Sequence, residues 1–141
     1  MAHDVRLDAL AAVPLFSACN KRELQKLAKA GDEIEVAPGK MLVDQGATGR
    51  EAFVILEGTA SVRRGNRRIA RFGPGDYFGE LSLFDTAPRN ATVRANTALA
   101  CIRLTPDAFE RALEVRAIRT ALLRGMAERI RQFDQRAYWS R

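Results

Sequence analysis

Residues 52–72, AFVILEGTASVRRGNRRIARF, contain three short segments with β-strand character, divided by turn residues. The first segment is an apolar run that ends before Gly58. The other two flank Gly65-Asn66, a pair that favours the tight turn of a β-hairpin. Short strands separated by turn residues at intervals of about 8 to 12 positions are typical of β-sandwiches and barrels. The stretch therefore predicts antiparallel β-structure at the centre of the chain.

The same pattern continues on both sides of this stretch. Residues 33–36 alternate between polar and apolar side chains, and residues 41–43 form a short apolar run. Two further runs, at residues 91–95 and 98–104, follow a turn rich in glycine and proline. We expect β-structure from residue 32 to residue 104.

Helical patterns lie before and after the predicted strands. Asn20 is of a residue type preferred at the N-cap of a helix, and Gly31 ends the apolar stripe that follows it. After the strands, Thr105 and Pro106 form a second start signal. Apolar residues at helical spacing then continue nearly to the end of the chain, and the sequence leaves open one long helix or two with a bend at residues 115–116. These residues are Phe109, Ala112, Leu113, Ile118, Leu122, Met126, Ile130 and Phe133.

The composition is that of one soluble domain. The chain has 141 residues, of which 47% are hydrophobic and 28% charged, so it can bury one core but is too short for two domains. No apolar run approaches the roughly 20 residues that a membrane span needs. The N-terminus lacks the basic start and apolar core of a secretory signal, so we expect a cytoplasmic protein.

Few side chains suited to metal binding or nucleophilic catalysis are present. Cys19 and Cys101 lie far apart in the sequence and are expected to be free thiols. His3, the only histidine, is close to the chain end. Histidine-rich metal sites and Ser-His-Asp triads are therefore disfavoured. We expect no enzymatic activity, no metal and no cofactor.

The net charge of +6 is unevenly distributed along the sequence. Residues 1–110 contain 15 basic and 14 acidic side chains, whereas residues 111–141 contain eight arginines and three acids. A nearly neutral body predicts no broad basic face, and nucleic acid is an improbable partner for this chain alone. The four arginines beside the predicted hairpin are interpreted as solvated. They are Arg63, Arg64, Arg67 and Arg68.

The most informative motif lies within residues 72–93, FGPGDYFGELSLFDTAPRNATV. Gly79 allows the backbone to approach a ligand closely, and the free amides of a short helix beginning at Glu80 would favour an anion. Arg89 offers a bidentate fork for a phosphate. Because a carboxylate beside an anion is repulsive, Glu80 is best explained as the acceptor for a hydroxyl of the same ligand. Together these groups predict a sugar phosphate site.

Residues 78–93, FGELSLFDTAPRNATV, resemble the phosphate-binding cassette of cyclic nucleotide-binding domains, as in the catabolite activator protein, protein kinase regulatory subunits and gated channels. The resemblance implies a mainly β fold with flanking helices. Its centre would be an eight-stranded antiparallel β-roll of the double-stranded jelly-roll type. The single domain, 1–141, would then consist of N-terminal helices at 1–31, the β-roll at 32–104 and a C-terminal helical lid at 105–141.

The resemblance also implies roles for individual residues. Glu80 would hold the ribose 2′-hydroxyl, with Gly79 permitting the close approach. The phosphate site would consist of Arg89, Asn90, Ser82 and Ala91, with backbone amides near Ser82 and Asn90 completing the cradle. The base would lie beside Val62, Leu81, Thr92 and Arg129, the last of these as a lid residue. Leu83 would relay ligand binding to the C-terminal helix.

The function implied is a regulatory domain that binds cAMP, or secondarily cGMP, and whose C-terminal helix moves on binding. The position after the cassette arginine is usually Ala, Ser or Thr in the family, so Asn90 leaves the choice of base open. The alternative is the sensor half of a DNA-binding regulator of the catabolite activator type. A homodimer through the C-terminal helix is a further expectation, and the sequence does not identify the effector.

Overall fold

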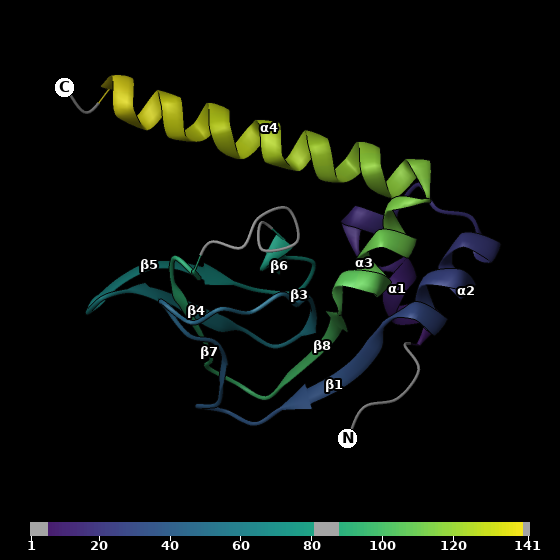
Figure 1. Cartoon of the computed structure of the whole chain (residues 1–141), viewed down its shortest axis with the longest axis horizontal. Helices are drawn as coiled ribbons and strands as arrows, with labels where there is room; N and C mark the ends of the chain where they lie inside the picture. Colours follow the sequence, from purple (N-terminus) through teal and green to yellow (C-terminus); the bar gives the residue numbers. More distant parts are fainter. Residues whose placement is uncertain (1–5, 81–87, 140–141) are drawn as a thin grey trace.

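The computed structural model describes residues 6–80 and 88–139 (Figure 1). Three short helices come first: α1 (Leu7–Ala11), the 3₁₀ helix η1 (Pro14–Phe16) and α2 (Lys21–Ala30). Two helices come last, α3 (Pro106–Leu113) and α4 (Arg116–Trp139). The strands between them are β1 (Asp32–Val36), β2 (Met41–Val43), β3 (Ala52–Glu57), β4 (Ala60–Arg64), β5 (Arg67–Phe72), β6 (Tyr77–Phe78), β7 (Thr92–Ala95) and β8 (Leu99–Leu104).

The eight described strands form two antiparallel sheets. One sheet has the order β1-β8-β3-β6 and the other the order β2-β7-β4-β5. Strands distant in sequence are therefore neighbours, as where β4 pairs with β7 through Val62 and Val93. This arrangement confirms the predicted β-roll with flanking helices.

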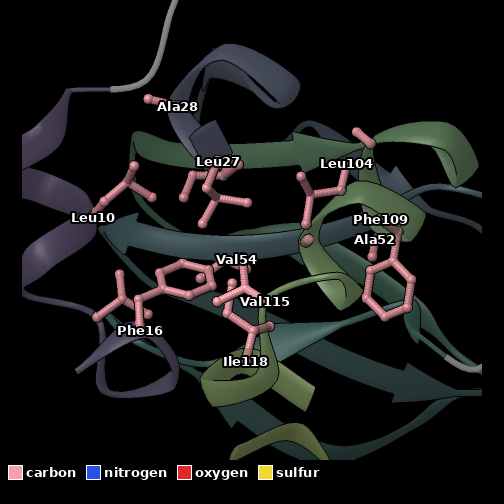
Figure 2. Close-up of a cluster of buried hydrophobic side chains, with 14 of the residues drawn as sticks. Leu10, Phe16, Leu27, Ala28, Ala52, Val54, Leu104, Phe109, Val115 and Ile118 are labelled. Atoms are coloured by element: carbon pink, nitrogen blue, oxygen red, sulfur yellow. The ribbon is translucent and has the colours of Figure 1, made fainter. Parts of the chain in front are cut away.

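Strand β3 explains why its sequence is a continuous apolar run. Phe53 and Ile55 face the core between the two sheets. Ala52 and Val54 face the opposite way, into a second core beneath the helices (Figure 2). Successive side chains of a strand point to opposite faces, so a strand covered on both faces needs apolar residues at every position. One strand thus holds both cores together.

Local sequence signals fix the helix ends as expected. Asn20 caps α2, because its side chain accepts a hydrogen bond from the backbone of Glu23 while the Glu23 carboxylate accepts one from the Asn20 backbone. Thr105 caps α3 in the same way, accepting from the Ala108 backbone at 3.3 Å. The C-terminal region forms two helices, with the break at residues 114–115.

Among residues 116–132 of α4, whose burial the structure describes, the fully buried side chains lie in the first two turns, and Met126 is partly buried against the same core. Ile118 and Leu122 are 2% and 3% exposed and pack into the core shared with α1, α2 and α3. Further along, Leu123 and Ile130 are 65% and 62% exposed. The apolar stripe that the sequence shows therefore belongs to the core at Ile118 and Leu122 and lies at the surface at Ile130. Figure 1 shows the reason: α4 extends past the other helices and runs alongside the β-roll.

Both cysteines are free thiols, as expected, with Cys19 half-buried and Cys101 buried. Across residues 6–80 and 88–139, no helix has the length and apolar character to cross a membrane.

Candidate functional site

A cavity of about 350 Å³ lies between the β-roll and helix α4. Part of its wall comes from strands of the second sheet, part from residues 77–80, and part from residues 88–91. Arg129 of α4 completes it. The lining residues are Val43, Val62, Phe72, Tyr77, Phe78, Gly79, Glu80, Pro88, Arg89, Asn90, Ala91, Val93 and Arg129.

Gly79 is required by both its backbone conformation and its surroundings. Its φ of 85° lies in the left-handed region that favours glycine. A Cβ atom there would be 2.6 Å from the carbonyl oxygen of Glu51 and 2.9 Å from Nη1 of Arg89. The absence of a side chain therefore allows Arg89 to lie directly against this part of the backbone.

The Arg89 guanidinium is held in place by backbone oxygens. Nη1 donates to the Gly79 carbonyl at 3.2 Å, and Nη2 donates to the Glu51 carbonyl at 2.8 Å. The main chain of Arg89 is also fixed, since its N–H donates to Ala47 at 2.9 Å and its carbonyl accepts from Gly46 at 2.8 Å. Partial burial lowers the pKa of Arg89 from its ordinary value. The result is a positioned, partly desolvated cation at the cavity wall, where an anion gains most from it.

Glu80 supplies the opposite charge in the same cavity. Its side chain is only 7% exposed, and Oε1 accepts a hydrogen bond from Nη1 of Arg129 at 2.7 Å. Arg129 also donates to the Tyr77 carbonyl at 3.2 Å, and its guanidinium carbon lies 4.5 Å from the centre of the Tyr77 ring. These contacts connect α4 directly to the Glu80 carboxylate in the cavity wall.

Gly125, one helical turn before Arg129, allows α4 to approach Tyr77. A Cβ atom at this position would overlap the Tyr77 hydroxyl, and it would lie 3.6 Å from the adjoining ring carbon. Burial raises the pKa of the Tyr77 phenol, and this effect exceeds the opposing effect of the nearby Arg129 guanidinium. Tyr77 is therefore a neutral platform that α4 contacts at both Gly125 and Arg129.

Several residues named from sequence meet at this cavity. Gly79, Glu80, Arg89, Asn90 and Ala91, named for the phosphate and the ribose, line it. Val62 and Arg129, named as neighbours of the base, line it as well.

Thr92 does not line the cavity. Its hydroxyl accepts a hydrogen bond from the Gln45 backbone at 3.0 Å, while Ala91 and Val93 on either side are buried. The expectation that Thr92 lies beside the base is corrected by the alternation of side chains along β7. Ser82, Leu81 and Leu83 were also named from sequence, and they lie outside the described residues.

Tyr77 and Gly125 were missed by the sequence interpretation. Tyr77 directly precedes the cassette, and the adjacent aromatic residues Tyr77 and Phe78 could have indicated a ring close to the ligand site. Gly125 interrupts a helical stretch, where glycine costs about 1 kcal/mol relative to alanine. A glycine in such a position indicates close packing, but only the fold identifies Tyr77 as its neighbour.

The site therefore combines a fixed cation, a nearly buried carboxylate and an apolar wall within one cavity. A ligand that matches it has an anionic group, a hydroxyl close to that group and a flat or apolar portion. Among the residues that the structure describes, no cluster of three or more histidine, cysteine or acidic side chains could hold a metal ion.

The fold and this site define a ligand-binding β-roll. Residues 33–116 match the family model described as the cyclic nucleotide-binding domain, which covers more than half of the chain. The chain belongs to this family and is a cyclic nucleotide-binding regulatory domain.

Known proteins support this assignment. The chain is 37% identical over 110 residues to a cAMP-dependent protein kinase regulatory subunit from Mycosarcoma maydis, an alignment that covers 72% of this chain and 21% of that protein. A solved structure described as Sp-2Cl-cAMPS bound to PKAR CBD2 is similar with a TM-score of 0.77 and 26% identity, covering 91% of this chain and 86% of that one. The chain thus spans about a fifth of the length of the curated relative it matches.

The catabolite activator protein of Thermus thermophilus has the same fold, with a TM-score of 0.81 at 23% identity. That likeness covers 89% of this chain and 62% of the other. It supports the β-roll architecture alone.

Proposed function

We propose that the cavity binds cAMP, with Arg89 pairing the cyclic phosphate and Glu80 accepting the ribose 2′-hydroxyl. The observation that carries the proposal is the presence of both groups on one cavity, nine positions apart in the sequence and each held in place by neighbouring atoms. A charged acceptor and a charged donor at fixed positions match a ligand that presents a hydroxyl and an anion together. The proposed role is binding without catalysis.

A cyclic diester suits this site better than an open nucleotide. Among the described residues that line the cavity, Arg89 and Arg129 are basic, and Arg129 pairs with Glu80. A cyclic diester brings one negative charge into this cavity, whereas the phosphate of 5′-AMP carries close to two near neutral pH and would lie near the Glu80 carboxylate. We expect 5′-AMP to bind far more weakly.

Helix α4 is the proposed regulatory element. The base would enter between the apolar wall, which includes Val62 and Val43, and the segment of α4 that carries Arg129. A ligand that contacts both the β-roll and α4 shifts the position of the helix by as much as its affinities for the two arrangements differ. The contacts of Gly125 and Arg129 with Tyr77 support this view, because they are the points where α4 meets the site.

We infer that cAMP is the preferred ligand and cGMP the second. Asn90 lines the cavity, and its carbonyl accepts a hydrogen bond from Nε of Arg64 at 3.1 Å, so its main chain is fixed. An asparagine can donate to a phosphate, but it does not reproduce the hydroxyl found at this position in many family members.

The exposed half of α4 is proposed as a dimer contact. Leu123 and Ile130 are seven residues apart, hence on nearly the same side of the helix, and both are largely exposed. Pairing of two α4 helices would bury them. Sedimentation of the wild type and of the Leu123→Glu/Ile130→Glu variant tests this, since we expect a dimer that the variant converts to a monomer. A wild-type monomer at high micromolar concentration contradicts it.

The activity that this domain would regulate belongs to another domain of a longer protein or to a separate partner protein. Regulation of a protein kinase and regulation of transcription are both consistent with the domain itself. The likeness to the catabolite activator protein shows the fold and does not favour the second.

Thermal unfolding in the presence of cAMP, cGMP and 5′-AMP tests the proposed function. Saturation at about 100 times Kd adds roughly 2.7 kcal/mol to the free energy of unfolding, so cAMP should raise Tm clearly. At the same concentration, 5′-AMP should have little effect. Equal shifts with the two nucleotides, or none with either cyclic nucleotide, would contradict the proposal.

A further inference from the structure

The sheet β2-β7-β4-β5 is strongly basic. Its four strands contain six arginines and no aspartate or glutamate. The expectation that the body of the domain has no broad basic face is therefore wrong, because strand pairing gathers residues that are spread over more than thirty positions of the sequence. The arginines are Arg63, Arg64, Arg67, Arg68, Arg71 and Arg94.

The strand register places four of these arginines on the outer face. Val62 and Val93 line the cavity and face inward, so the residues on either side of them face outward. Ser61 lies between Arg94 of β7 and Arg71 of β5 in one row. Arg63 lies opposite Arg68 beside a shift in the β4–β5 register. We call the four residues Arg63, Arg68, Arg71 and Arg94 the arginine face.

The arginine face is not neutralised by carboxylates of the described part of the chain. In the described part of the chain, the basic members of the ion pairs are Arg6, Lys26, Arg103 and Arg129, and none of them belongs to this sheet. Like charges on neighbouring strands are destabilising. A charged edge strand also discourages aggregation, but Arg63 and Arg94 lie on inner strands, where no edge needs protection. An anionic partner would remove this repulsion.

Strand β5 offers that partner a second means of recognition. It is the last strand of its sheet, and residues 67–71 are all exposed. The described strand pairs connect β5 to β4 alone, so its other edge is available for main-chain hydrogen bonds. An extended peptide can use such an edge, whereas a lipid surface or a nucleic acid backbone cannot. Ile69, 42% exposed on this strand, adds an apolar contact.

We propose that β5 and the arginine face bind an acidic, extended segment of a partner protein, which adds to the sheet as a strand beside β5. Carboxylates on one face of the added strand pair with Arg68 and Arg71, and residues of a longer acidic segment reach Arg63 and Arg94. A second copy of β5 is not the preferred added strand, because the arginines of the two β5 strands would then lie opposite one another.

The proposal is independent of nucleotide binding. The arginine face lies on the side of the sheet opposite Val62 and Val93, which line the cavity. Substitution of Arg68 and Arg71 should leave cAMP binding within about twofold of wild type. Failure of this proposal and failure of the proposed function are thus separately observable.

The experiment uses acetyl-(Glu-Thr)₄-amide as the probe, with amide NMR shifts and the fitted Kd as readouts. We expect shifts concentrated at residues 67–72, and at least tenfold weaker binding to Arg68→Glu/Arg71→Glu. The Arg68→Gln/Arg71→Gln variant should also bind more weakly, with less disturbance of the fold. The control is Arg22→Glu/Lys29→Glu on the exposed face of α2, which makes the same charge change and should bind within about threefold of wild type.

A peptide N-methylated at alternate residues separates strand addition from charge attraction. It keeps the carboxylates but loses main-chain donors, so we expect at least tenfold weaker binding. Equal binding of the methylated peptide, an equal loss in the α2 control, or no binding at millimolar peptide would overturn the proposal. So would tighter binding, through Arg68 and Arg71, of phosphatidylserine vesicles or of a single-stranded oligonucleotide.

Discussion

Arg129 of α4 lies 2.7 Å from Oε1 of Glu80, a residue 49 positions earlier that forms part of the cavity wall. The carboxylate is nearly buried, whereas the arginine side chain is 47% exposed. Glu80 is thus the point at which the C-terminal helix and the proposed ribose site meet. Because Arg129 pairs with Glu80, a ligand that contacts Glu80 also changes the surroundings of Arg129. This gives α4 a direct physical connection to ligand binding.

Replacement of Arg129 by alanine should lower the free energy of unfolding by about 1–2 kcal/mol. Hydrogen bonds to charged groups are stronger than neutral ones, but this arginine is partly solvated. Chemical denaturation of Arg129→Ala, with Arg124→Ala on the same helix as the control, measures the loss. The Glu80→Gln/Arg129→Ala pair should be non-additive, and additive losses would show that the two side chains are not coupled.

The ribose contact can be tested with 2′-deoxy-cAMP. Glu80→Ala should weaken cAMP binding by about 1–3 kcal/mol, because one charged acceptor is lost. The deoxy ligand should bind poorly to the wild type and lose little further on the variant. Titration calorimetry of both ligands on both proteins completes the cycle, and equal effects of the substitution on the two ligands would show that Glu80 does not contact the 2′-hydroxyl.

Gly125 should resist substitution for a reason that a second substitution can remove. Gly125→Ala would favour an isolated helix by about 1 kcal/mol, yet here the new methyl group overlaps the Tyr77 hydroxyl. We expect the variant to displace α4 and to weaken cAMP binding about tenfold. Tyr77→Phe removes the hydroxyl and leaves the ring carbon at ordinary contact distance, so Gly125→Ala/Tyr77→Phe should recover most of the affinity. No recovery would mean that close packing is not the cause.

Cys101 should make the domain less stable at high pH. Burial raises the pKa of its thiol from 9.0 to about 12. Below about pH 9 the thiol is protonated in both states and contributes no pH dependence. Between about pH 9 and 12 the unfolded chain loses this proton while the folded chain keeps it, so the free energy of unfolding falls by up to about 1.4 kcal/mol per pH unit. Urea denaturation across this range should show a shallower decline for Cys101→Ala, and identical slopes would contradict the burial of an un-ionised thiol.

The order of α4 should depend on ligand. Hydrogen exchange of residues 123–132 should slow on addition of saturating cAMP, while residues 118–122, already packed in the core, should change little. Truncation after residue 122, which keeps the core residues Ile118 and Leu122, should weaken cAMP binding at least tenfold, which is about 1.4 kcal/mol. Unchanged exchange together with unchanged affinity would show that α4 is not a lid.

The features that sequence predicted well are local ones. The caps at Asn20 and Thr105, and the hairpin turn at Gly65, each depend on a few adjacent residues. The candidate site could be proposed from the sequence for the same reason, since Gly79, Glu80 and Arg89 belong to one contiguous motif. Thr92 was misplaced because the sequence alone does not show which alternate residues of β7 face the cavity.

The features that sequence missed depend on long-range pairing. The arginine face forms because β7 pairs with β4, which brings Arg94 beside residues more than twenty positions earlier. The fit of Gly125 on Tyr77 depends on the direction in which α4 leaves α3. The exposure of Ile130 has the same origin, because helical periodicity identifies an apolar side of a helix but not where the surface beneath it ends.

Calorimetric titration of the wild type, Arg89→Ala and Arg94→Ala with cAMP tests the central claim most directly. Arg89 is fixed at the cavity wall by Gly79 and Glu51, whereas Arg94 lies on the outer face and donates to the Gly39 carbonyl. We predict micromolar or tighter binding, about −8 kcal/mol, for the wild type and Arg94→Ala, and a loss of about 2–5 kcal/mol for Arg89→Ala. Wild-type protein that does not bind cAMP, or an Arg89→Ala variant that binds as tightly as Arg94→Ala, would contradict the assignment of this cavity as a cyclic nucleotide site.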